Sequence, residues 1–254
     1  MTEDKENYPS FRETVRRISK PMRGGAKMWE DARFVLADVP IDRREAKRIL
    51  PFGLRPSEPA MATLFIADYP KTSFTVPYKE AALLIHVRTL LGRGLHCPWM
   101  IVDDDTGLIY GRELLGYPKK LGVFTFDEDG DRISASIARR DVEVLKIKGE
   151  RKDREEKPKP VFDVKTFNAG GPGQLFLIQP IWMFRPKEVI SESWSADVEV
   201  TLNDSEYDPI ARLVDGEAIN GRFVVMDIIG GRYYLPAGMA GPRWFVNNFY
   251  MRYR

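Results

Sequence analysis

Glycine and proline recur along the whole chain rather than in one linker, and this limits the length of any regular element. The 254 residues include 20 glycines and 18 prolines. Many short strands with frequent turns favour an antiparallel sheet or barrel over an alternating strand–helix fold. No internal repeat or domain boundary is visible, so we expect a single domain over residues 1–254. The expected strands are the short apolar or β-like runs at 61–67, 81–87, 99–102, 108–110, 123–126, 133–137, 174–178, 198–202 and 222–228.

Two local signals predict defined elements. Asp42 can cap a short helix in the segment DRREAKRIL, which Pro51 ends. The segment DEDGDR has Asp129-Gly130 at its centre and lies between two apolar runs, which predicts a hairpin.

Other segments predict loops. Residues 1–27 are polar and contain prolines and paired glycines, so we expect an irregular N-terminal arm. The run 148–160, KGERKDREEKPKP, carries both signs of charge and is typical of a solvated hairpin loop. Asp103–Asp105 has the composition of a turn, and the glycines of 170–173 lack the lysine and hydroxyl residue of a phosphate loop.

Composition argues against several function classes. Lys plus Arg is 39 and Asp plus Glu is 37, so no basic excess indicates a nucleic-acid partner. No apolar run approaches the roughly 20 residues of a membrane-spanning helix, and no apolar secretory signal is visible. The single cysteine, Cys97, excludes an intrachain disulfide, and two histidines make a dense His/Cys metal site unexpected. We therefore expect a soluble cytoplasmic protein without a metal.

The segment with the most chemical content is 111–124, GRELLGYPKKLGVF. Its two adjacent lysines, Lys119 and Lys120, have apolar flanks, and Pro118 restricts the backbone before them. In a strand, one lysine would face an apolar interior and the other would lie nearer solvent or a carboxylate. A buried lysine has a lowered pKa, so its free amine can attack a ketone and form a Schiff base.

GRELLGYPKKLG resembles the Schiff-base segment of the acetoacetate decarboxylase family. Weaker matches occur in order at 42–54, at Pro77–Glu80 and at 208–227. The resemblance implies a mostly β (α+β) fold, with antiparallel sheets around a cone-shaped barrel and few short helices. It also implies a homo-oligomer that needs no cofactor beyond a lysine imine. Lys119 takes the Schiff-base role, Lys120 that of the neighbouring cation, and Glu80 that of an active-site glutamate.

Further residues are candidates for substrate binding. Tyr78 neighbours Glu80 and could handle protons, as could Tyr250 near the end of the sequence. Arg112 and Glu113 lie within the motif, where they either contact substrate or hold the loop by an ion pair.

Two positions depart from the family pattern. Leu64 stands where the decarboxylases have a second carboxylate, and Ala32 stands where they have an arginine. Arg33 is one residue further along and could serve if the alignment shifts.

Three functions are therefore open. The first is decarboxylation of a small 3-oxo acid. The second is aldol condensation and dehydration of pyruvate with an aldehyde co-substrate, as in superfamily members that lack decarboxylase activity. The third is a barrel that binds small molecules without catalysis.

Overall fold

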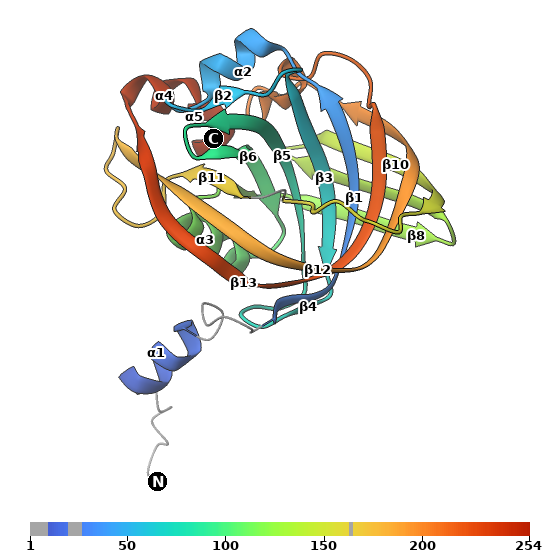
Figure 1. Ribbon diagram of the computed structural model, residues 1–254, viewed down its shortest axis with the longest axis horizontal. Helices are drawn as coiled ribbons and strands as arrows, with labels where there is room; N and C mark the ends of the chain where they lie inside the picture. The colour runs from blue at the N-terminus through green and yellow to red at the C-terminus, as the bar shows by residue number, and fades with distance from the viewer. Residues whose placement is uncertain (1–9, 20–26, 163–164) are drawn as a thin grey trace.

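The computed structural model describes residues 10–19, 27–162 and 165–254, and most of this part of the chain is strand (Figure 1). The strands are β1 (Lys27–Pro40), β2 (Arg55–Pro56), β3 (Met61–Tyr69), β4 (Lys71–Thr72), β5 (Tyr78–Thr89), β6 (Gly92–Val102), β7 (Lys119–Leu121), β8 (Val123–Asp129), β9 (Arg132–Arg139), β10 (Val142–Arg154), β11 (Thr166–Ala169), β12 (Gln179–Leu202) and β13 (Asn220–Ala240). The helices are α1 (Phe11–Ser19), α2 (Arg43–Ile49), α3 (Asp105–Leu115), α4 (Pro242–Asn247) and α5 (Phe249–Tyr253), with a 3₁₀ turn at Pro209–Arg212.

In the described residues the thirteen strands form one curled sheet. Its main order is β11-β6-β5-β3-β1-β13-β12-β10-β9-β8, and β11 pairs with both β6 and β12. Most neighbours are antiparallel, whereas the β6–β7 and β6–β11 pairs are parallel. The expectation of a mostly β fold with few short helices is confirmed.

Strand alternation divides the buried apolar residues into two clusters. On β3, Leu64 and Ile66 belong to one cluster, whereas Phe65 and Ala67 belong to the other. The second cluster also contains Tyr78 of β5, and helix α3 lies over this side of the sheet (Figure 1). The candidate site lies in this second cluster.

Both of the local signals are confirmed. The Asp42 side chain accepts hydrogen bonds from the backbone N–H groups of Arg44 and Glu45, at 2.7 and 2.8 Å, and so caps α2. β8 and β9 form the hairpin around Gly130, whose φ of 59° is in the left-handed region that glycine tolerates.

Four predictions are wrong. Part of the expected irregular arm, 11–19, is helix α1, and the rest of 1–26 apart from Ser10 lies outside the described residues. The charged run 148–160 is not all loop, because β10 continues to Arg154. Residues 174–178 are irregular, and β12 begins only at Gln179. The run 108–110 is helical rather than extended, because it lies within α3.

Helix α3 has capping residues at both ends, although the apolar run 108–110 by itself favoured a strand. Asp104 is its N-cap and accepts a 2.5 Å hydrogen bond from the Gly107 N–H. Gly116 ends the helix in the left-handed conformation. The expected turn at Asp103–Asp105 therefore leads directly into a helix that carries the first five residues of the lysine motif.

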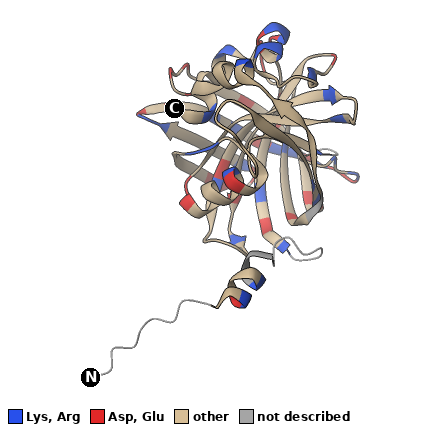
Figure 2. Cartoon of the chain, turned by 90° about the vertical axis from the view of Figure 1, so that its left-hand side faces the viewer, with Lys and Arg blue, Asp and Glu red and all other residues tan. Residues whose placement is uncertain are grey.

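Figure 2 shows acidic and basic residues interspersed over the ribbon. Of the helices in the described residues, none is long and apolar enough to cross a membrane.

Candidate active site

The two lysines of the motif occupy the three-residue strand β7, which extends the sheet beside β6. Lys119 is paired with Met100 and Lys120 with Ile101. Both residues are buried, with 5% and 6% of their surface exposed. Because side chains alternate along a strand, they enter two different environments.

Lys119 points at a glutamate. Its Nζ donates a hydrogen bond to Oε2 of Glu80 at 2.6 Å, and both side chains are buried. The other carboxylate oxygen of Glu80 accepts a 3.2 Å hydrogen bond from the Tyr69 hydroxyl. The centroid of the Tyr78 ring lies 5.4 Å from Nζ of Lys119.

The aliphatic part of Lys119 is confined by helix α3. A Cβ atom added to Gly111 would lie 2.5 Å from Cδ of Lys119, and closer still to Cε. Real Cβ atoms essentially never approach that closely. Glycine at this position thus lets the helix backbone lie directly against the lysine.

The amine opens into a largely apolar cavity of about 190 Å³. Of the described residues that line it, only Lys119 and Glu80 carry a charge. The lining residues are Met28, Trp29, Tyr69, Phe74, Glu80, Met100, Gly107, Tyr110, Gly111, Leu114, Leu115, Tyr117, Lys119, Phe162, Phe184, Pro186, Ile228 and Tyr234.

Lys120 enters a separate polar cluster instead of the cavity. It forms an ion pair with the fully buried Asp208 and donates to the backbone carbonyls of Tyr207 and Tyr250, at 3.0 and 3.2 Å. Arg139 binds the other oxygen of Asp208 at 2.9 Å. Burial lowers the pKa of Lys120 to about 8, although Asp208 opposes the shift. Lys120 therefore anchors β7 to the segment around Asp208 through an ion pair.

The tyrosines differ from the sequence interpretation. The Tyr78 hydroxyl accepts a hydrogen bond from Nε1 of Trp29 at 2.9 Å, and the contact of Tyr78 with Lys119 is through its ring. Tyr69, which the sequence analysis missed, lines the cavity and holds Glu80. Burial raises the pKa of both hydroxyls well above the ordinary value, so they stay protonated. Tyr69 lies opposite Tyr78 in the β3–β5 pair, so only a prediction of this strand register would have found it.

Arg112, Glu113 and Tyr250 are not brought into the cavity. Arg112 donates hydrogen bonds to the backbone carbonyls of Lys119 and Arg252, at 3.0 and 3.1 Å, and so holds β7 against α5. Glu113 is exposed on α3. Tyr250 contributes its backbone carbonyl to Lys120, while its side chain is 41% exposed.

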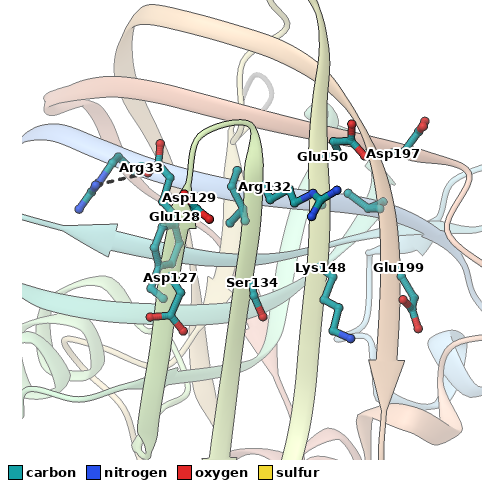
Figure 3. A pocket seen from close by; sticks show the side chains of 14 residues that line it. Arg33, Asp127, Glu128, Asp129, Arg132, Ser134, Lys148, Glu150, Asp197 and Glu199 are labelled. Carbon is teal, nitrogen blue, oxygen red and sulfur yellow. Dashed lines mark hydrogen bonds and ion pairs between the residues drawn. The ribbon is translucent and has the colours of Figure 1, made fainter.

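Arg33 does not replace the missing family arginine in this geometry. Its guanidinium pairs with Asp68 and Glu128 in a charged groove along β8, β9, β10 and β12 (Figure 3). Ala32, its neighbour on β1, belongs to the cluster around the cavity. Leu64 faces the opposite cluster, and its cavity-side neighbour Phe65 is apolar, so β3 supplies no carboxylate there.

The fold and the site together define a class of protein. Its members have a curled, mainly antiparallel sheet and a buried lysine–glutamate pair in an apolar cavity. The family model described as acetoacetate decarboxylase matches residues 9–236 of the sequence. The chain belongs to the acetoacetate decarboxylase family.

Curated relatives agree with this assignment. The acetoacetate decarboxylase of Chromobacterium violaceum is 25% identical over 215 residues, which cover 80% of this chain and 85% of that protein. The enzyme of Burkholderia ambifaria strain MC40-6 is 26% identical over 216 residues, covering 82% and 87%. Together with the family match, they indicate a lyase-type enzyme related to acetoacetate decarboxylase.

Solved structures share the fold. The acetoacetate decarboxylase of Legionella pneumophila superposes with a TM-score of 0.73 at 16% identity, covering 85% of this chain and 87% of that one. The enduracididine biosynthesis enzyme MppR, complexed with pyruvate, superposes with a TM-score of 0.65 at 18% identity, covering 80% and 88%.

Proposed function

We propose that this protein is a cofactor-independent lyase that decarboxylates a small 3-oxo acid through a Schiff base on Lys119. The observation that carries the proposal is the 2.6 Å pairing of this buried amine with Glu80 inside an apolar cavity. A carboxylate at that distance is the group placed to take a proton from the amine before the amine attacks. The neutral amine formed by that transfer is the nucleophile that adds to a carbonyl carbon.

The reaction balances without a further reactant. The amine of Lys119 adds to the C3 carbonyl, and loss of water gives an iminium ion. The C1–C2 bond then breaks, its electron pair forms the C2–C3 double bond of an enamine, and C1 leaves as carbon dioxide. A proton adds to C2, and water hydrolyses the resulting iminium to a methyl ketone and the free amine. Glu80 is the group nearest the amine for these proton transfers, and Tyr69 orients it.

The lining favours decarboxylation over condensation of pyruvate. Pyruvate keeps its carboxylate throughout an aldol reaction, and the described lining offers no cation for it apart from the reacting amine. A 3-oxo acid loses its carboxylate as carbon dioxide, and apolar surroundings give that charge little stabilisation while it is present.

Reductive trapping tests the proposal. The protein is incubated with acetoacetate or pyruvate, borohydride is added, and peptides are sequenced by mass to assign the modified lysine. We expect an acetone-sized adduct on Lys119, and none on that peptide in Lys119→Met. A pyruvate-sized adduct without an acetone-sized one would support the aldol reaction instead. No adduct from either, with both compounds bound reversibly, would indicate a binding protein without catalysis.

We also propose a homo-oligomer, as the family resemblance implies. Light scattering that gives a mass near the 29.2 kDa of one chain would exclude it.

A further inference from the structure

We propose that one end of the molecule, formed by α2, β2, α4 and the β5–β6 turn, binds the anionic surface of a lipid bilayer. The contact is peripheral and needs no membrane-spanning segment: cations meet the lipid headgroups, and two apolar side chains enter the boundary between headgroups and acyl chains. Helices α2 and α4 and strand β2 lie together at this end (Figure 1). The surface is separate from the lysine cavity, because its buried floor of Leu50, Leu54 and Trp244 belongs to the other apolar cluster.

Three arginines form a row across neighbouring strands at this end. Arg55 of β2 is paired with Arg88 of β5, and Arg88 is paired in turn with Arg93 of β6. Side chains of directly opposed residues lie on the same face of a sheet, roughly 5 Å apart at Cβ, and like charges placed in this way are destabilising. Among the described residues, Glu58 is the one carboxylate with an ion pair to this row, at 3.0 Å from Arg88. Most of the positive charge of the row is therefore available to an anion outside the protein.

A groove of about 1000 Å³ continues the positive surface toward α2 and α4. Of the described residues that line it, none is acidic and five are basic: Lys47, Arg48, Arg55, Arg88 and Arg243. The whole chain has a net charge of only +2, so cations are concentrated here. Clusters of roughly four to eight Lys and Arg residues are typical of surfaces that bind anionic lipids, and each such cation strengthens binding about fivefold.

Two apolar side chains project beside these cations. Phe52, in the loop between α2 and β2, is 93% exposed, and Leu90, in the turn between β5 and β6, is fully exposed. Because β2 and β5 are antiparallel, the start of β2 and the end of β5 lie at the same edge, which brings both connections there. A Cβ atom added to Gly53 would meet no described atom within 4 Å, so the tip of the Phe52 loop is not packed against the protein. A soluble anion would leave both apolar side chains in water, whereas a bilayer buries them, and the pair therefore favours a bilayer.

Vesicle sedimentation tests the proposal. The full chain is mixed with vesicles of phosphatidylcholine alone, or of phosphatidylcholine with phosphatidylglycerol, and the bound fraction is measured. We expect binding to the anionic vesicles to be stronger by at least about tenfold, and to weaken as salt is added, because salt screens the attraction. Equal binding to both kinds of vesicle, or no binding to the anionic ones, would overturn the proposal.

A charge variant tests the contribution of the cations. Arg55→Gln/Arg243→Gln removes two of them and should weaken binding to anionic vesicles by about 25-fold. The matched control, Arg132→Gln/Arg154→Gln, makes the same change at exposed arginines of β9 and β10 and should bind within about threefold of the wild type. Equal binding by the two variants would refute the assignment of this end of the molecule.

An apolar variant tests the two projecting side chains. Phe52→Ser/Leu90→Ser should weaken binding to anionic vesicles by at least about tenfold, whereas the control Val189→Ser, at an exposed valine of β12, should stay within about threefold. The replaced side chains are exposed, so we expect every variant to stay folded by thermal unfolding and to keep its imine trapping on Lys119. If the protein ignores anionic vesicles and Phe52→Ser/Leu90→Ser lowers its mass in light scattering, a second copy of the chain covers this surface and the proposal is wrong.

Discussion

Replacing Gly111 by alanine is expected to displace the amine of Lys119 while the protein stays folded. The new Cβ would lie 2.5 Å from Cδ of the lysine, whereas ordinary van der Waals contact begins at 3.4 Å. Lys119 and helix α3 must therefore separate by roughly 1 Å, and a misplacement of that size can cost about 100-fold in rate. Alanine is a better helix former than glycine by about 1 kcal/mol, which offsets part of the strain.

Gly107 offers a matched control on the same face of α3, four residues earlier. A Cβ there would meet Asp104 Oδ2 at 3.2 Å and the Tyr78 ring at 3.5 Å, and no atom of Lys119 is among its nearest neighbours. Gly107→Ala makes the same chemical change in the same helix. Its turnover should stay within about threefold of the wild type, because the amine is not moved.

The assay is borohydride trapping on Lys119, measured as a rate beside kcat/KM, with thermal unfolding of each variant. We expect Gly111→Ala to lose about 100-fold in both rates and to unfold within a few degrees of the wild type. The reasoning would be refuted by a Gly111→Ala protein that traps and turns over substrate as fast as Gly107→Ala, since the position of the amine would then not matter.

Three further predictions concern single residues. Glu80→Gln keeps the shape of the side chain but removes the proton acceptor, so trapping on Lys119 should slow at least about tenfold; an unchanged rate would remove Glu80 from the chemistry. Asp208→Asn leaves the buried Lys120 and the half-buried Arg139 without their carboxylate. It should lower the free energy of unfolding by about 3–5 kcal/mol in urea titration, with trapping retained in the folded protein; a change under 1 kcal/mol would contradict the buried pairing. Burial lowers the pKa of His96 from its ordinary 6.5 to about 4. On acidification the unfolded chain therefore takes up the proton before the folded chain does, and the free energy of unfolding should fall by about 3 kcal/mol between pH 6.5 and 4. His96→Gln should lose that part of the slope, and an equal slope in both proteins would contradict it.

The sequence predicts what depends on local pattern. The capped helix after Asp42, the hairpin at Gly130 and the alternation of Lys119 and Lys120 all follow from turn chemistry or strand periodicity. Each involves neighbouring residues whose preferences agree with the fold.

The rest depends on residues far apart in sequence. No local signal pairs Lys120 with Asp208, because the contact arises only when β7 and the 3₁₀ turn meet in the folded chain. Arg33 was a candidate through its place in the sequence, yet strand alternation sends its side chain away from the cavity beside which Ala32 lies. A one-residue difference along a strand reverses the side of the sheet and so the role.

The alternation of side chains along a strand also affects how this site tolerates insertions and deletions. If β7 slipped by one residue against β6, Lys120 would take the place of Lys119 opposite Met100 and could still present an amine to the cavity. Asp208 would then face the next residue, Leu121, and would keep Arg139 as its remaining ion partner. Because the two lysines are adjacent, the site would still have an amine after a one-residue shift of β7. The buried carboxylate of Asp208 disfavours that shift, because it would lose its pairing with Lys120, and so it holds the strand in one register.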